Sequence, residues 1–333
     1  MRGSSEHSLP GPINGAMPGR RLSAASACVG LGCGGLMRDP SRKSRQRLLA
    51  TALDIGVTHF DVARMYGLGA AEMEVGRFAR GHRDQIVIAT KFGIEANAPS
   101  GMFARAQGPA RRLVARYPKV RSYLKNSSES FHRRRYDAHA ARESLDVSLT
   151  ALGSDYVDLF LVHDPLPTDS FDLAEICGFL DDEQSAGRIR AWGIAGEQEP
   201  CVELREAMPP GAVLQVRDDV FDALPDGARA SGPTITFGVL AGPLERITTH
   251  ASSSAELRER WLSETGVDFA APGPVARLLI RDAVERNGDG VVLISTTRPE
   301  RLQGLVELVT VGADEMQLQA LRRVAGESAP RQR

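Results

Sequence analysis

The sequence predicts an α/β fold, a (β/α)8 TIM barrel with a parallel eight-stranded sheet. From about Ala27, short apolar or β-branched runs alternate with longer segments of helical period. Eight of these runs have strand character, which is the number of strands that closes such a barrel. An open doubly wound sheet also repeats strand and helix, so the strand count by itself leaves that architecture open.

The expected strands and helices alternate along the chain. The strands are expected at 28–32, 57–60, 86–91, 157–162, 191–194, 213–216, 234–237 and 291–294. The helices are expected at 41–55, 70–80, 138–152, 173–186, 200–208, 275–287 and 299–309, with Ser41 as the N-cap of the first. The helical pattern between the sixth and seventh strands is weak.

The domain organisation predicted from these elements is simple. Residues 1–26 are rich in Gly, Pro and Ser without periodicity and are expected to form a flexible tail. Residues 27–333 are expected to form one barrel domain, since barrels of this kind reach 250 residues or more as single domains. The stretch 95–135 is an expanded loop rich in Arg and Lys, interpreted as a lid or pocket wall.

Composition narrows the class of partner. The formal net charge of -1 gives no general attraction to nucleic acid or to an anionic membrane, so a small-molecule partner is expected. No apolar run approaches the roughly 20 residues needed to cross a bilayer, and a cytoplasmic protein is expected. The four cysteines lack CxxC spacing and are expected to be buried thiols, with neither a disulfide framework nor a metal site.

A glycine-rich run follows the first expected strand. Residues 30–35 match the pattern GxGxxG, and Asp61 lies at a suitable distance along the sequence for a ribose-binding acid. A Rossmann dehydrogenase is therefore an alternative. Pro40 resists the helix that should follow directly in a Rossmann unit. The favoured interpretation is a turn whose glycines keep the backbone clear of a ligand or a neighbouring loop.

Four ionisable residues lie at or just beyond the carboxyl ends of three consecutive expected strands: Asp61, Tyr66, Lys91 and His163. Barrel active sites form at that face. A buried lysine needs a counterion, which Asp61 on the neighbouring strand can supply. A cation beside a tyrosine lowers its pKa, so Tyr66 is expected to act as a general acid, with His163 orienting the same substrate oxygen.

The motifs around these residues resemble the aldo-keto reductase superfamily. The segments DVARMYGLGAAE, ATKFG, LGSDYVDLFLVHDP and SAGRIRAWGIAG match that template, from about Cys28 to Leu302 outside the insertion. The resemblance implies hydride transfer between a nicotinamide and a carbonyl carbon. It also implies that Tyr66 protonates the carbonyl oxygen, Lys91 lowers its pKa, Asp61 pairs with Lys91 and His163 orients the substrate.

The resemblance also implies a set of cofactor-binding residues. Gln215 is expected to reach the nicotinamide carboxamide, Phe237 to stack on the ring, and Leu240 to lie in the pyrophosphate loop. Thr296 and Arg301 are expected at the adenosine end, where Ser295 replaces a lysine and Leu305 an asparagine found in relatives. Ala195 and Gly196 stand where the family has a Ser-Asn pair for the carboxamide.

The expected function is an NAD(P)-dependent oxidoreductase acting on a small-molecule carbonyl or alcohol. NADP(H) is the first expectation for the cofactor, with NAD(H) as the alternative because a 2′-phosphate site without the lysine is weakened. Two other functions stay open at this point. One is a nicotinamide-binding redox-sensing or auxiliary subunit with little turnover, and the other is an NAD-dependent sugar dehydrogenase of the same superfamily.

Overall fold

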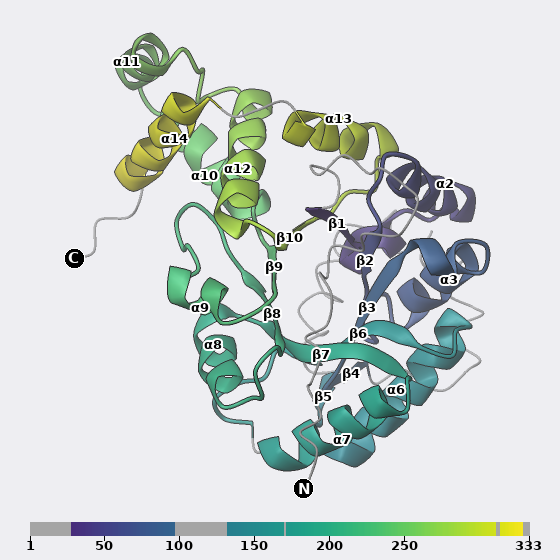
Figure 1. Cartoon of the computed structure of the whole chain (residues 1–333). Coiled ribbons are helices and arrows are strands. Elements are labelled where there is room, and N and C mark those ends of the chain that lie inside the picture. The colour runs from purple at the N-terminus through teal and green to yellow at the C-terminus, as the bar shows by residue number, and fades with distance from the viewer. Residues whose placement is uncertain (1–27, 97–131, 170, 311–313, 329–333) are drawn as a thin grey trace, which may run out of the picture.

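The eight expected strands form a closed barrel. The structure, a computed structural model, describes residues 28–96, 132–169, 171–310 and 314–328. Its parallel strands are ordered β1-β10-β9-β8-β7-β6-β3-β2 around the barrel, so strands consecutive in the chain are neighbours in space (Figure 1). This closure confirms the (β/α)8 barrel and rules out the open sheet and the Rossmann alternative.

The strand bounds agree with expectation to within about two residues. The strands are β1 (Val29–Gly32), β2 (His59–Asp61), β3 (Val87–Phe92), β6 (Val157–His163), β7 (Ile189–Gly196), β8 (Val213–Arg217), β9 (Thr234–Phe237) and β10 (Val291–Ile294). Most of these residues are buried on both faces, which explains why the strands appear in the sequence as continuous apolar runs.

The seven expected helices are present around the outside of the barrel. They are α2 (Arg42–Asp54), α3 (Ala70–Ala79), α6 (Ala138–Leu152), α7 (Leu173–Ser185), α8 (Gln198–Glu206), α12 (Pro272–Asn287) and α13 (Pro299–Thr310). The Ser41 side chain accepts a hydrogen bond from the backbone N–H of Ser44, as expected of an N-cap. The weak helix between β8 and β9 is the single short turn α9 (Asp226–Ala230).

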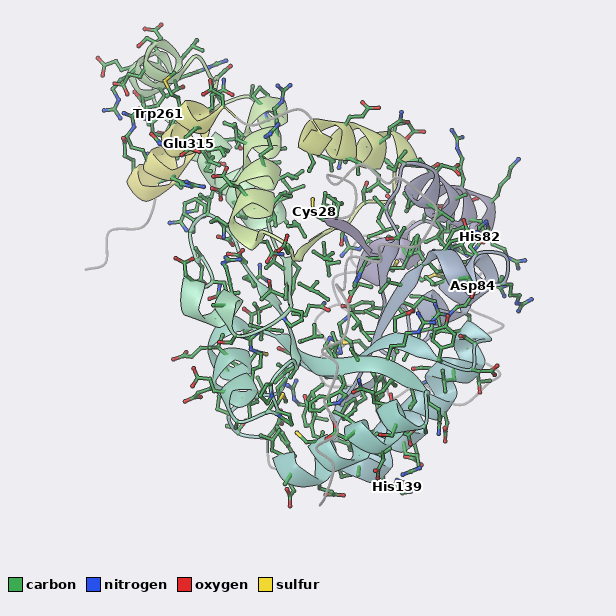
Figure 2. The ribbon with its side chains drawn as sticks, in the orientation of Figure 1. Cys28, His82, Asp84, His139, Trp261 and Glu315 are labelled. Atoms are coloured by element: carbon green, nitrogen blue, oxygen red, sulfur yellow. The ribbon has the colours of Figure 1, made fainter. Side chains whose placement is uncertain are left out.

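Three helices were not expected from the sequence: α10 (Ala241–Ala251), α11 (Ala255–Thr265) and α14 (Glu315–Ser328). They pack with α12 into a group at one side of the barrel, where α11 lies outermost (Figure 1). Trp261, labelled in Figure 2, is fully buried in this group and donates a hydrogen bond to Glu327. Burial of Trp261 and its hydrogen bond therefore tie α11 to α14.

The ends of the expected insertion form a small antiparallel hairpin. It consists of β4 (Ile94–Ala96) and β5 (His132–Arg134) and stands at the end of β3, beside the carboxyl ends of the barrel strands. The expected tail, residues 1–26, and the stretch 97–131 lie outside the described residues. The lid interpretation of the whole insertion therefore stays a prediction.

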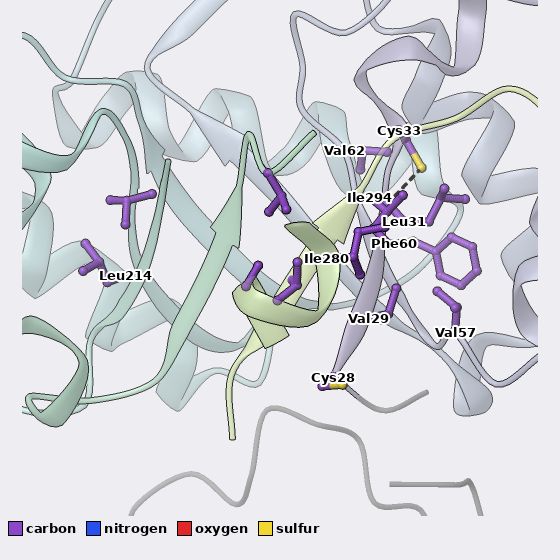
Figure 3. Close-up of a cluster of buried hydrophobic side chains, with 14 of the residues drawn as sticks. Cys28, Val29, Leu31, Cys33, Val57, Phe60, Val62, Leu214, Ile280 and Ile294 are labelled. Atoms are coloured by element: carbon purple, nitrogen blue, oxygen red, sulfur yellow. Dashed lines mark hydrogen bonds between the residues drawn. The ribbon is translucent and has the colours of Figure 1, made fainter. Parts of the chain in front are cut away.

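Two apolar layers hold the barrel together. Large side chains such as Phe60 and Leu214 fill the space between strands and helices, and Figure 3 shows part of this outer layer. Inside the barrel, aliphatic side chains including Ala89, Leu161, Val213, Ile235 and Leu293 form a separate cluster.

The glycine-rich run forms a turn, as the favoured interpretation predicts. Residues Cys33–Arg38 form a short 3-10 helix directly after β1. Its first turn is tied down by Cys33, whose thiol contacts the carbonyl oxygen of Leu31 at 3.6 Å (Figure 3). A Cβ atom on Gly34 would lie 3.5 Å from the ring of Tyr66, so this glycine brings the backbone close to that ring.

Candidate active site

A buried ion pair forms the base of the site. Lys91 on β3 donates hydrogen bonds to the Asp61 carboxylate at the end of β2 and, at 2.9 Å, to the carbonyl oxygen of Val62. Lys91 and Asp61 are only 1% and 3% exposed. The expected pairing is confirmed, and it is required physically because either charge alone would be strongly unfavourable in this position.

Tyr66 lies above this pair on the turn between β2 and α3. The turn is formed by three successive left-handed residues, Gly67, Leu68 and Gly69, which reverse the chain after Tyr66. The Nζ atom of Lys91 is 5.4 Å from the centre of the Tyr66 ring. The phenol is therefore near the ion pair, in the position expected from the sequence.

The ionisation of Tyr66 differs from expectation. Burial, followed by the negative charge of Asp61, raises the pKa of Tyr66 well above its ordinary value. The pKa of Tyr66 is therefore raised and not lowered as expected, because burial and the Asp61 charge outweigh the effect of the Lys91 charge. Tyr66 is consequently a protonated phenol across the neutral range.

His163 faces Tyr66 from the end of β6. The two rings are 6.1 Å apart and nearly perpendicular. Tyr136, which follows the β4–β5 hairpin, donates a hydrogen bond of 2.8 Å to the carbonyl oxygen of His163. The end of β6 is thereby fixed, and the four residues expected to carry the chemistry are brought together from three consecutive barrel strands and the loop after β2.

These side chains open into a cavity of about 570 Å³, a volume typical of small-molecule sites. Gln215 and Phe237 line the same cavity, as expected for residues near a nicotinamide. Ser295, which was expected at the adenosine end, also lines this cavity. A second cavity of about 780 Å³ shares Phe237, Leu293 and Ser295 with the first, so the two adjoin; together they are called the elongated cavity. Leu240 and Arg301 line this second part.

Thr296 is not among the residues that line either cavity. Its hydroxyl accepts a hydrogen bond of 3.1 Å from the backbone N–H of Arg298 and so stabilises the turn that leads into α13. The neighbouring Ser295 donates a hydrogen bond of 3.0 Å to the carbonyl oxygen of Gly32 and thereby links the ends of β10 and β1. In this structure the side chain of Thr296 therefore stabilises the turn before α13 and does not face either cavity.

Gln215 provides a test of whether a nicotinamide fits. It lies on β8 inside the barrel, is 3% exposed, and its Oε1 atom has no hydrogen-bond partner among the described residues. A buried, unpaired amide oxygen is costly unless a ligand pairs with it. An N–H group of a bound ligand would satisfy it, and the primary amide of a nicotinamide carries such groups.

Three charged residues of the cavity wall were not predicted from the sequence: Arg134 on β5, Asp164 directly after His163, and Glu197 directly after β7. Asp164 follows a strand end without a break, which is a signal that could have identified it. Arg134 reaches the cavity only because the hairpin folds back beside β6, where the arginine pairs with Asp169 at 3.1 Å. The position of Arg134 in the sequence does not indicate that it lies near the cavity.

Other kinds of site find no support in the described part of the chain. No group of three or more His, Cys, Asp or Glu side chains there is placed to hold a metal ion. All four cysteines are buried as thiols, as expected. No described helix combines the length and apolar character that crossing a membrane would require.

A closed parallel barrel with its ionisable residues at the carboxyl ends of the strands has the architecture of a barrel enzyme. Within that class the chain belongs to the aldo/keto reductase family, whose sequence profile matches residues 28–221. The match covers more than half of the chain and includes Asp61, Tyr66, Lys91 and His163. Gln215 also lies inside it, whereas Phe237 and the adenosine-end residues lie beyond it.

Individual relatives are distant. The aldo-keto reductase yakc (NADP(+)) of Schizosaccharomyces pombe is 29% identical over 212 residues, 62% of this chain and 53% of the relative, so the match spans about half of that protein. Pyridoxal 4-dehydrogenase of Microbacterium luteolum is 25% identical over 85% of this chain and 89% of its own. An aldo-keto reductase of Bacillus halodurans has a similar fold, with a TM-score of 0.66 at 16% identity, covering 89% of this chain and 91% of its own.

Proposed function

We propose that this chain is an NAD(P)-dependent oxidoreductase that interconverts a small-molecule carbonyl and the corresponding alcohol. The observation that carries the proposal is the meeting of Tyr66 and His163 in one cavity above the buried Lys91–Asp61 pair. Family membership and the relatives named above support the same reaction class.

Tyr66 is the proton donor in the direction of reduction. Its raised pKa keeps the phenol protonated until negative charge develops on the carbonyl oxygen, at which point the proton can transfer. In the opposite direction the phenolate form of Tyr66 accepts the proton of the alcohol. His163 holds the reacting oxygen beside Tyr66 from the opposite side of the cavity.

The Lys91–Asp61 pair positions Tyr66 and stabilises charge. The Lys91 ammonium lies close enough to the phenol ring to favour the phenolate that forms when the proton leaves. Asp61 limits this effect in the resting site and holds the lysine in place. Tyr66 therefore stays protonated in the resting site, and the lysine stabilises the phenolate once the proton has been transferred.

The elongated cavity has the residues to hold a dinucleotide. Gln215 would accept from the amide of the nicotinamide, Phe237 would contact its ring, and Leu240 and Arg301 would line the rest of the cofactor. When bound, this cofactor supplies or accepts the hydride. The residues of the cavity fix its orientation and exclude water from the reacting atoms.

The decisive variant is Tyr66→Phe. It removes the hydroxyl and keeps the ring, so turnover should fall by about 100-fold or more, the usual size of a general-acid contribution, while cofactor affinity stays within about twofold. Turnover is measured by nicotinamide absorbance and affinity by nucleotide fluorescence. Tyr156→Phe is the matched control, because Tyr156 packs between Arg83 and Arg190 away from the cavity. Unchanged turnover in Tyr66→Phe would overturn the assignment.

A substrate panel completes the test. Aldehydes, ketones, sugars and polyols are assayed with NADPH and NADH for reduction and with NADP and NAD for oxidation. Turnover of at least one carbonyl–alcohol pair is expected, together with its loss in Tyr66→Phe. Tight cofactor binding without turnover across the panel would instead support a redox-sensing or auxiliary subunit.

A further inference from the structure

Asp164 occupies an unusual place in the cavity wall. It follows His163 at the end of β6 and has a φ of 50°, a left-handed conformation that is uncommon outside glycine, asparagine and aspartate. Its backbone N–H donates to the carbonyl oxygen of Ala195, and its own carbonyl oxygen accepts from Arg134. Strained backbone held from both sides is typical of residues with a functional position.

The Asp164 carboxylate lies over the end of β7. A Cβ atom on Gly196 would be 2.9 Å from the Cα of Asp164 and 3.1 Å from its Oδ1, so the aspartate fills space that a side chain at position 196 would need. Ala195 beside it has only a methyl group. This part of the cavity wall therefore takes its polar character from Asp164.

The carboxylate keeps capacity for another hydrogen bond. The backbone N–H of Glu197 lies near it, and the nearest cation among the described residues, Arg134, is 3.9 Å away and held by Asp169 at 3.1 Å. The Asp164 side chain is 39% exposed, towards the cavity that it lines. A carboxylate has about four acceptor positions, of which these contacts use a part.

A second acceptor lines the same cavity. Gln215 is on β8, the strand that follows β7 around the barrel, and Ala195 is its register partner. Its buried Oε1 is without a partner among the described residues. Asp164 and Gln215 thus flank the cavity wall at Ala195 and Gly196 with two oxygen acceptors. The complementary ligand group has two N–H bonds on one nitrogen, which is the donor set of a primary amide.

We propose that Asp164 is a cofactor-binding residue, whose carboxylate joins Gln215 Oε1 in accepting the two N–H bonds of the nicotinamide carboxamide. The inference rests on the proposed function and adds a residue to its site. The side-chain contacts missing at Ala195 and Gly196 are then supplied from β6, by the residue next to His163.

The test compares two ligands that differ only in the amide. In the 3-acetylpyridine analogue of the dinucleotide a methyl group replaces the amide nitrogen, so both N–H bonds are lost. Dissociation constants of both ligands are measured by calorimetry, without turnover. The wild-type chain should bind the nicotinamide form about tenfold more tightly, as expected for hydrogen bonds to a charged acceptor.

Asp164→Gly removes the carboxylate and suits the left-handed backbone, so it should fold. In this variant the preference for the nicotinamide form should fall to about threefold or less, which is the preference that the hydrogen bond to Gln215 alone would give. Asp164→Asn keeps an oxygen acceptor and also tolerates this backbone, and it should retain an intermediate preference. Asp146→Asn is the matched control: this exposed carboxylate on α6 pairs with Arg188 and does not line the cavity, so the variant should keep the wild-type preference.

Two results would overturn the proposal. One is an unchanged preference in Asp164→Gly, and the other is an altered KM for the carbonyl substrate with unchanged dissociation constants, which would place Asp164 in the substrate site. A wild-type chain that binds neither dinucleotide contradicts the proposed function itself. The two failures are therefore distinguishable.

Discussion

At the scale of single residues, the site depends on how burial sets protonation. Tyr66, Lys91 and Asp61 are close together in a region that excludes water, and the effect of each charge depends on its partner. The lysine paired with Asp61 does not pre-ionise the tyrosine, whose pKa is raised. The resting site therefore holds a phenol ready to donate, an arrangement suited to the reduction of a carbonyl.

This protonation state predicts different pH profiles for the two directions. Because the pKa of Tyr66 is raised, the phenol persists as pH increases, and kcat for reduction should stay level between about pH 6 and pH 9. Oxidation needs the tyrosine to accept a proton, so kcat for oxidation should rise across the same range. Steady-state rates in both directions check this. A fall in reduction with a midpoint near pH 7 would contradict it.

At the scale of elements, close approach between helices decides where a side chain is tolerated. Gly76 on α3 contacts the end of α6, where an added Cβ would lie 2.5 Å from the carbonyl oxygen of Leu152 and 2.6 Å from its Cα. These are backbone atoms, so the helices themselves would have to separate. The α3–α6 contact matters for the site because α3 follows the turn that holds Tyr66.

Two glycine substitutions should therefore act in opposite directions. Gly76→Ala should lower the free energy of unfolding by about 1–3 kcal/mol through overpacking against Leu152. Gly178→Ala, on the exposed side of α7 with no atom within 4 Å, should raise it by up to about 1 kcal/mol through helix propensity. Urea unfolding followed by circular dichroism measures both. Equal effects would mean that the α3–α6 contact is looser than described.

Local sequence patterns predicted the regular strand–helix units but not every helix of the fold. The regular strand–helix units were predicted because each has a continuous apolar strand and an amphipathic helix. Helix α10 begins Ala-Gly-Pro and contains two threonines, a composition that does not favour a helix in isolation. It forms because Ile247 and Ala251 are buried within the group formed with α12 and α14.

At the scale of the whole molecule, the barrel encloses a titratable group that the reaction does not use. His59 on β2 faces the barrel interior beside Gly30, and both of its ring nitrogens lack partners among the described residues. Burial lowers its pKa to about 4. The folded protein therefore resists protonation of His59, whereas the unfolded chain takes up the proton near pH 6.5.

Global stability should consequently fall in mildly acidic solution. Because the pKa of His59 is lower in the folded than in the unfolded protein, its stabilising contribution is complete at pH values above the unfolded pKa of about 6.5. This contribution, up to about 3 kcal/mol, is lost as the pH falls from about 6.5 to 4. His59→Leu should flatten the pH dependence in this window, as measured by urea unfolding. His139→Leu, an exposed histidine on α6, is the control and should leave the wild-type slope. A wild-type slope in His59→Leu would contradict the assignment.

The sequence by itself predicted the eight strands of the barrel and the position of Asp61, Tyr66, Lys91 and His163 at or just beyond strand ends. The reason is that strand periodicity and residues placed at strand ends are local properties, preserved whichever neighbours surround them. Only the tertiary structure decided that burial and the Asp61 charge raise the pKa of Tyr66, and that Thr296 bonds to the backbone. It also brought Arg134 and Asp164 to the cavity wall. Charge balance, burial and the filling of space depend on contacts between segments far apart in the chain, which no local pattern contains.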